Sequence, residues 1–199
     1  MRAAIVVPYR DRAVHLSQFL DRMRPYRHDV IVIHQGDELP FNRAKLFNVF
    51  FKEYGSDYDY FVCHDVDMIP IDADYSYSDI PTHLATKCSQ FGFVMPYPEY
   101  FGGVTMFTSR DFERVDGYSN DFWGWGGEDD EMRKNVLSHG LSIGSRVCKF
   151  DSLPHASNIN TDLRAKNIRR LHEGRISGLS NCEYKVVDKA KRWITVRFD

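Results

Sequence analysis

Residues 3–33, AAIVVPYRDRAVHLSQFLDRMRPYRHDVIVI, contain the pattern of a strand, a helix and a second strand in close succession. Residues 3–8 are apolar and largely β-branched, as in a buried strand, and so are residues 30–33. Between them, apolar residues recur at roughly helical spacing over 11–24, and Pro25 ends that helix. This order predicts an α/β fold with a mostly parallel sheet, whose ligand crevice lies at the carboxyl ends of the strands.

The same alternation continues along the chain. Residues 42–54 have the spacing of a helix that Gly55 ends, and residues 60–63 form a third apolar strand. The acidic start of residues 127–138 is typical of a helix N-terminus. At 199 residues the chain is long enough for one buried core, and no linker divides it, so we expect a single domain. The other expected elements are strands at 91–95, 104–107, 183–187 and 192–198, the last two compatible with a hairpin, and a short helix at 109–115.

The composition is that of a globular domain, with 43% hydrophobic and 27% charged residues. No stretch approaches the roughly 18 consecutive apolar residues of a membrane helix, so no membrane-spanning segment is expected. The net charge of −2 gives no reason to expect nucleic acid as a partner. The four cysteines (Cys63, Cys88, Cys148 and Cys182) lie in or beside apolar runs without metal-knuckle spacing, which predicts buried free thiols.

The first candidate site is His64-Asp65-Val66-Asp67, which directly follows the third predicted strand. Two carboxylates at positions i and i+2 of a strand end can both face the crevice, and their hard oxygens suit Mg²⁺ or Mn²⁺. Two aspartates beside a turn also commonly cap the backbone or remain solvated. The D-x-D pattern by itself therefore leaves both interpretations open.

A second candidate site is the stretch 123–131, WGWGGEDDE. Its glycines give the backbone freedom, so that a tryptophan can close over the flat apolar face of a sugar ring. The acids that follow begin a helix, whose dipole favours the ionised form, and an ionised carboxylate is a candidate general base. A simple helix cap with an aromatic anchor is the alternative, and the density of tryptophans, glycines and acids argues against it.

Three further stretches are compatible with ligand binding. Residues 97–103, YPEYFGG, suit either a close approach of the backbone to a ligand or a tight turn. Residues 8–12, PYRDR, follow the first strand, and residues 41–45, FNRAK, open the second helix. Arginines at these places can point into the crevice and match a phosphate or carboxylate. Surface arginines with local carboxylate partners are an equal alternative.

Taken together, these motifs resemble those of the β-1,4-galactosyltransferase family, glycosyltransferase family 7. The resemblance spans about residues 3–187 and implies a single-domain GT-A fold over residues 1–199, with a Rossmann-like sheet and flanking helices. It also implies an inverting, metal-dependent transfer with Mn²⁺ as cofactor, in which galactose moves from UDP-galactose to a sugar hydroxyl of a saccharide or glycoconjugate in β-1,4 linkage. The motifs that carry it are NRAKLFN at 42–48, DVD at 65–67, YFGGV at 100–104 and WGWGGEDD at 123–130.

The resemblance further implies roles for individual residues. Asp129 would be the catalytic base, and Asp67 and His155 would bind the metal. The size of Tyr100 would favour UDP-galactose over UDP-N-acetylgalactosamine. The polar segment at about 152–180 is expected to be a mobile lid. The implied donor-binding residues are Pro8, Arg10, Arg12, Phe41, Arg43, Asp65, Tyr100, Gly103 and Trp125, and the implied acceptor-binding residues are Trp125, Glu128, Asp129 and Asp130.

The sequence also departs from the family pattern. The residues just before His155, SLP at 152–154, include neither the methionine nor the histidine often found there, and Gln90 stands where a lysine is common. The membrane stem of Golgi members is absent, so we expect a cytoplasmic location as the sequence stands, or the Golgi lumen if a targeting segment has been removed. Two other functions remain open: a metal-dependent sugar nucleotidyltransferase or phosphohydrolase, and a non-catalytic carbohydrate-binding domain.

Overall fold

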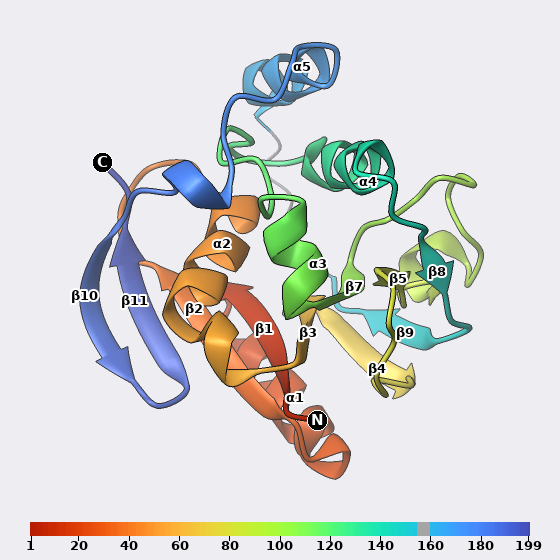
Figure 1. Cartoon of the computed structure of the whole chain (residues 1–199). Coiled ribbons are helices and arrows are strands. Elements are labelled where there is room, and N and C mark those ends of the chain that lie inside the picture. The colour runs from red at the N-terminus through yellow and green to blue at the C-terminus, as the bar shows by residue number, and fades with distance from the viewer. Residues whose placement is uncertain (155–159) are drawn as a thin grey trace.

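A central sheet organises the part of the chain that this computed structural model describes, residues 1–154 and 160–199. Its strand order is β10-β11-β2-β1-β3-β7-β5-β8, and a smaller sheet beside it has the order β4-β9-β6 (Figure 1). Four of the seven neighbouring pairs in the large sheet are parallel, which confirms the predicted mostly parallel sheet. The strands are β1 (Ala3–Tyr9), β2 (Asp29–Gln35), β3 (Tyr60–His64), β4 (Met68–Asp72), β5 (Thr82–His83), β6 (Lys87–Cys88), β7 (Val104–Thr108), β8 (Gly144–Ser145), β9 (Lys149–Ser152), β10 (Lys185–Ala190) and β11 (Trp193–Arg197).

Helices cover the two faces of this sheet, and β1 shows why. Successive side chains of a strand point to opposite faces, so the unbroken apolar run of β1 buries both of its sides. Ala4 and Val6 belong to the hydrophobic cluster that includes α2, whereas Ile5 and Val7 belong to the cluster that includes α1. Figure 1 shows α2 and α3 on one face. The α-helices are α1 (Ala13–Met23), α2 (Arg43–Tyr54), α3 (Ser109–Arg114), α4 (Glu128–Ser138) and α5 (Thr161–Arg170).

Most of the predicted elements are confirmed within one or two residues, and the C-terminal strands do form a hairpin, β10 and β11. The strand predicted at 91–95 is wrong. Ser89–Phe91 is a 3-10 turn, and the backbone then takes φ angles of +64° at Gly92 and +63° at Phe93. Two consecutive left-handed residues cannot continue an extended strand. The apolar side chains there instead belong to a loop.

The prediction about the cysteines is confirmed. All four cysteines are buried free thiols. Among the described residues, no helix is long and apolar enough to cross a bilayer.

Candidate active site

The carboxyl ends of β1 and β2 lead into the predicted donor-binding residues. Pro8 is buried in β1, and the Arg10 guanidinium lies 5.5 Å from the centre of the Phe41 ring. Arg10 Nη1 donates to the carbonyl oxygen of Leu39 at 2.6 Å, which fixes the arginine against the loop before α2. Arg12 stands at the N-terminus of α1. The structure therefore gathers Pro8, Arg10 and Phe41 at one end of the sheet, as the sequence indicated.

Arg43 joins the two acidic motifs. Asn42 caps α2 by accepting a hydrogen bond from Lys45 N at 2.9 Å, so that Arg43 is the first helical residue. Its Nε donates to Asp65 Oδ1 at 2.5 Å, and its Nη1 donates to Asp129 Oδ1 at 2.7 Å. The D-x-D turn after β3 and the acidic start of α4 therefore lie side by side.

The charges of this cluster do not balance. Arg43 Nη1 also lies 3.6 Å from Glu128 Oε1, so one guanidinium faces three carboxyl groups. Burial raises the pKa of Asp129 to about 6 and that of Asp65 to about 6, although Arg43 opposes both shifts. Burial and the neighbouring Asp129 raise the pKa of Glu128 to about 7. The excess of negative charge and hard oxygens suits a divalent cation.

Two glycines let the backbone approach Asp129. Gly103 has a φ of +78°, which favours glycine, and its carbonyl oxygen accepts from Asp65 N at 3.1 Å. A Cβ atom added to Gly102 would lie 2.7 Å from Asp129 Oδ2 and 2.9 Å from the Tyr100 hydroxyl. Any side chain at position 102 would therefore collide with the cluster. The backbone thus approaches the acidic cluster closely, and its approach to a ligand stays a prediction.

The loop before α4 carries two tryptophans in different environments. Gly124, Gly126 and Gly127 all have φ angles between +77° and +95°. Trp123 packs edge-on against Phe198, with the ring centres 5.9 Å apart, and is half-buried. Trp125 by contrast is 56% exposed. The loop thus has one anchored and one solvent-facing indole.

Trp125 of this loop and Asp130 of α4 are predicted acceptor-binding residues, and both contact neighbouring side chains. The Arg164 guanidinium of α5 lies 4.9 Å from the centre of the Trp125 ring. Asp130 Oδ1 accepts a hydrogen bond from the Tyr97 hydroxyl at 2.9 Å. Tyr97 belongs to the 97–103 stretch that the sequence singled out, although no contact with Asp130 was predicted for it, whereas Arg164 carries no local signal that distinguishes it from an ordinary surface residue.

The predicted metal ligands are only partly described. Asp67 is half-buried in the turn between β3 and β4, and its carbonyl oxygen accepts from Leu153 N at 2.8 Å. His155 lies outside the described residues. Within residues 1–154 and 160–199, no group of three or more His, Cys, Asp or Glu side chains is arranged to hold a metal ion. The role of His155 therefore remains a prediction.

His64 supports the D-x-D turn, a role that sequence analysis missed. Its Nδ1–H donates to the Asp65 carbonyl oxygen at 2.9 Å, and its Nε2 accepts from the Tyr75 hydroxyl at 2.9 Å. Burial lowers the pKa of His64 to about 4, so the ring is neutral at neutral pH. In sequence alone, a histidine at the end of an apolar strand cannot be told from a core histidine.

A mostly parallel sheet with a D-x-D turn at the end of a central strand is characteristic of the GT-A class of glycosyltransferase folds. Two family models match the chain. One, described as the N-terminal region of glycosyl transferase group 7, matches residues 1–79, and another, described as the N-terminal domain of galactosyltransferase, matches residues 82–160. The chain belongs to glycosyltransferase family 7, the β-1,4-galactosyltransferase family.

Curated relatives share this family. Human β-1,4-galactosyltransferase 4 is 36% identical over 94% of this chain and 59% of that protein. Mouse β-1,4-galactosyltransferase 1 is 34% identical over 94% of this chain and 51% of that protein. The chain thus spans between half and three fifths of the length of these relatives.

Solved structures agree with the fold. The catalytic domain of Drosophila β-1,4-galactosyltransferase 7 in complex with xylobiose superposes with a TM-score of 0.86 at 28% identity, covering 100% of this chain and 94% of that chain. A mutant of the same fly enzyme, in complex with manganese, UDP-Gal and xylobiose, gives a TM-score of 0.77 at 26% identity, again covering 100% and 94% of the two chains.

Proposed function

We propose that this protein is an inverting, metal-dependent galactosyltransferase that moves galactose from UDP-galactose to a sugar hydroxyl in β-1,4 linkage. The observation that carries the proposal is the position of Asp129, held by Arg43 beside the D-x-D turn and against the Gly102 backbone. Family membership and the named relatives support the same activity. A nucleotidyltransferase would have no use for an exposed indole beside its acids, and a binding domain would have no use for the D-x-D turn.

Asp129 is the general base in this proposal. Its Oδ1 is occupied by Arg43 Nη1, which leaves Oδ2 to take the proton of the acceptor hydroxyl. The hydroxyl oxygen then attacks the anomeric carbon from the face opposite UDP, the new glycosidic bond forms, and the bond to the diphosphate breaks. A pKa of about 6 keeps Asp129 ionised at neutral pH and still basic enough to accept a proton.

Asp67 and His155 are the proposed ligands of Mn²⁺, with Asp65 beside them. The negative cluster fits such an ion, and the Leu153 N–Asp67 O bond brings the chain that leads to His155 up to the turn. The fly enzyme was solved with manganese and UDP-Gal together. When bound, the ion would neutralise the charge that grows on the departing diphosphate. Arg43 Nη2 is buried and has no hydrogen-bond partner among the described residues. It would donate a hydrogen bond to an oxygen of the sugar-nucleotide donor.

The acceptor would lie between Trp125 and the Glu128–Asp129–Asp130 turn. Trp125 offers an apolar ring face, and carboxylates at this turn can accept hydrogen bonds from sugar hydroxyls. The fly enzyme complexes contain xylobiose, which supports a saccharide hydroxyl as the acceptor group.

Donor binding would precede acceptor binding. Of the residues of α5, only Asn167 is buried, and its Nδ2 donates to the Trp123 carbonyl oxygen at 3.0 Å. The helix is therefore held to the loop by few contacts, and ligands can shift its position. Hydrogen exchange across α5 and residues 123–127 is expected to slow when UDP and Mn²⁺ are added together. Equal exchange with and without them would contradict the ordered lid.

One experiment tests the proposed activity directly. UDP-sugars are screened against monosaccharide acceptors with Mn²⁺, and both UDP and pyrophosphate are measured. Release of UDP with a β-1,4-linked galactoside is the expected result, whereas release of pyrophosphate would favour the nucleotidyltransferase.

Asp67→Ala is expected to remain folded and to lose nearly all transfer, because it removes a ligand at a strand end and no part of the core. Near-normal turnover of this variant would reject the metal assignment.

A further inference from the structure

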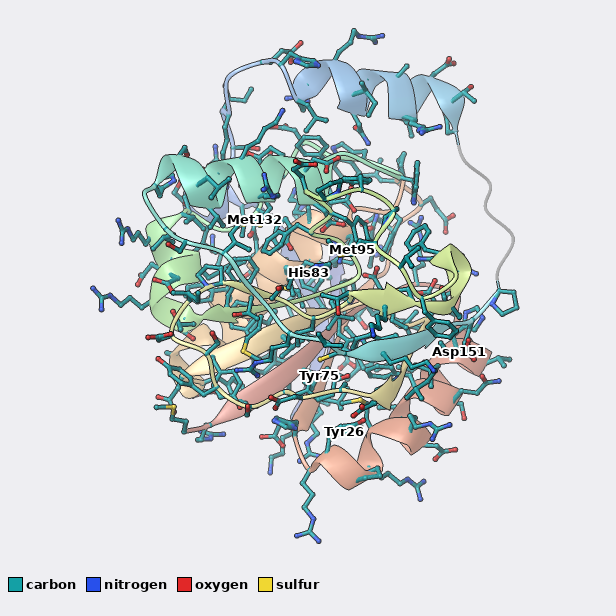
Figure 2. The ribbon with its side chains drawn as sticks, turned by 90° about the vertical axis from the view of Figure 1, so that its right-hand side faces the viewer. Tyr26, Tyr75, His83, Met95, Met132 and Asp151 are labelled. Atoms are coloured by element: carbon teal, nitrogen blue, oxygen red, sulfur yellow. The ribbon has the colours of Figure 1, made fainter. Side chains whose placement is uncertain are left out.

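A buried histidine outside the family motifs supports the wall of the donor pocket. His83 is one of the two residues of β5 and is 3% exposed. Its backbone is held on both sides, because β5 pairs with β7 through Thr105 and with β8 through Ser145. Figure 2 shows His83 in the interior of the molecule, and Met132 of α4 also lies inside. The backbone that carries the imidazole is therefore paired on both sides.

The imidazole bonds to the backbone of the glycine pair. His83 Nε2 lies 3.0 Å from the Gly102 carbonyl oxygen, and because a carbonyl oxygen only accepts, Nε2 must carry the proton. Burial lowers the pKa of His83 to about 4, so the ring is neutral at neutral pH and has this single N–H. The tautomer of His83 is thus fixed by Gly102.

The same imidazole also holds Tyr100. The two rings meet edge to face, with their centres 5.4 Å apart and an interplanar angle of 83°. Phe91 and Tyr97 contact the other sides of the Tyr100 ring in the same manner, at 5.7 Å and 5.5 Å. Edge-to-face contacts favour one ring orientation, so these neighbours fix the direction of the Tyr100 hydroxyl.

His83 therefore contacts two neighbouring parts of the site, the Gly102 backbone and the Tyr100 ring. Gly102 and the Tyr100 hydroxyl lie against each other and against Asp129 Oδ2, and the next carbonyl, that of Gly103, accepts from Asp65 N. A shift of the Gly102 backbone by a few tenths of an ångström would open space beside Tyr100 and would also change the distance to Asp129. The Gly102 carbonyl oxygen also accepts a hydrogen bond from Val104 N at 3.0 Å, and among the described side chains His83 alone donates to it.

We propose that His83 is a positioning residue for donor specificity: through the Gly102 carbonyl and the Tyr100 ring it keeps the pocket too narrow for a donor sugar with an N-acetyl group. The inference rests on the proposed function, because it takes Tyr100 as a neighbour of the donor sugar. His83 itself contacts neither the sugar nor the metal. Its effect passes entirely through the two residues that it holds.

The test compares two substitutions of His83. His83→Gln keeps an N–H donor at similar reach, whereas His83→Leu keeps the volume and loses the donor. The readout is the ratio of kcat/KM for UDP-galactose to kcat/KM for UDP-N-acetylgalactosamine. We expect His83→Leu to lower this ratio about tenfold, the equivalent of one lost hydrogen bond, and His83→Gln to restore most of it. Tyr100→Leu removes the aromatic ring itself and gives the largest fall in this ratio that an open pocket allows.

Controls distinguish a loss of positioning from a general loss of stability. Tyr60→Phe also removes a buried hydrogen bond to a carbonyl oxygen, that of Tyr75 at 3.0 Å, and is expected to lower the melting temperature and leave the donor ratio unchanged. If His83→Leu does not fold, His83→Asn serves instead, because its shorter side chain stays polar but does not reach Gly102. A ratio that stays at the wild-type value in His83→Leu or His83→Asn overturns the inference alone. A wild-type protein that transfers no sugar rejects the proposed function, and this inference with it.

Discussion

The two sides of the candidate site are built differently. Around Arg43, which is buried, hydrogen bonds of 2.5 and 2.7 Å fix Asp65 of the donor side and the proposed base Asp129. On the acceptor side, Trp125 is 56% exposed, and α5 has Asn167 as its single buried residue. The core therefore holds the reacting charges in place before substrates bind. The surface that is proposed to receive the acceptor is exposed and can change its conformation. Such a division suits a site in which the donor binds first.

The largest expected effect comes from removing the proposed base from the cluster around Arg43. Asp129→Asn keeps the shape of the side chain and its contact with Arg43, but it cannot take a proton. We expect kcat to fall about 10³-fold, the usual contribution of a general base, with little change in the affinity for UDP. Initial rates and UDP titration by calorimetry measure the two quantities. Asp121→Asn, in the loop before α4, where Asp121 pairs with Arg170, is the control and is expected to stay within a fewfold of wild type.

Arg43→Lys tests whether one guanidinium organises the donor side. A lysine keeps the charge but cannot bond to Asp65 and Asp129 at once, so we expect kcat to fall about 10- to 100-fold. Because Arg43 opposes the rise in the pKa of Asp129, its weakening raises this pKa further, and the acid limb of the pH–rate profile moves to higher pH. Arg170→Lys, at another half-buried ion pair, is the control. An unshifted acid limb would show that Arg43 does not tune the base.

Glu128→Gln tests the stability cost of the charged cluster. The pKa of Glu128 is raised in the folded protein to about 7, so the folded state holds the proton more tightly than the unfolded chain does. Its ionisation therefore destabilises the fold as the pH rises from about 4.5 to 7, and the cost remains above that range. In the metal-free protein, Glu128→Gln is expected to raise the free energy of unfolding by about 1 to 3 kcal/mol at about pH 8, with little change at about pH 4.5.

Urea unfolding at the two pH values measures this effect. Glu99→Gln, on an exposed carboxyl, is the matched control and is expected to change stability at neither pH. Equal stabilities of Glu128→Gln and wild type at the higher pH would mean that Arg43 already compensates for all the carboxylates of the cluster.

The smallest effect is expected on the acceptor side. Arg164→Ala removes the guanidinium above the Trp125 ring, a contact of about 0.5 to 1 kcal/mol at an exposed site. The acceptor KM is therefore expected to change about two- to fivefold, while kcat and the affinity for UDP stay as they are. Arg169→Ala on the same helix is the control. A change in UDP affinity instead would place α5 on the donor side and would remove the contrast between the two halves.

Much of the fold could be predicted from the sequence because it depends on local patterns. The β-branched runs of β1 and β2, and the stop at Gly55 after α2, follow from periodicity and backbone preferences that neighbours in sequence determine. The exception at 91–95 is instructive. An apolar run predicts a strand, but the tertiary structure uses those side chains in a loop whose backbone turns at Gly92 and Phe93.

The sequence by itself also determined which residue types the proposed sugar-nucleotide site combines, since the D-x-D turn and the tryptophan–glycine–acid stretch are local in the chain. Only the tertiary structure decided how they act together. The sharing of Arg43 between Asp65 and Asp129, the support of Gly102 by His83 and the capping of Trp125 by Arg164 all join residues far apart in sequence. The physical reason is that the pKa values and the shape of the site depend on burial and on distances between side chains, and packing of the whole chain sets both.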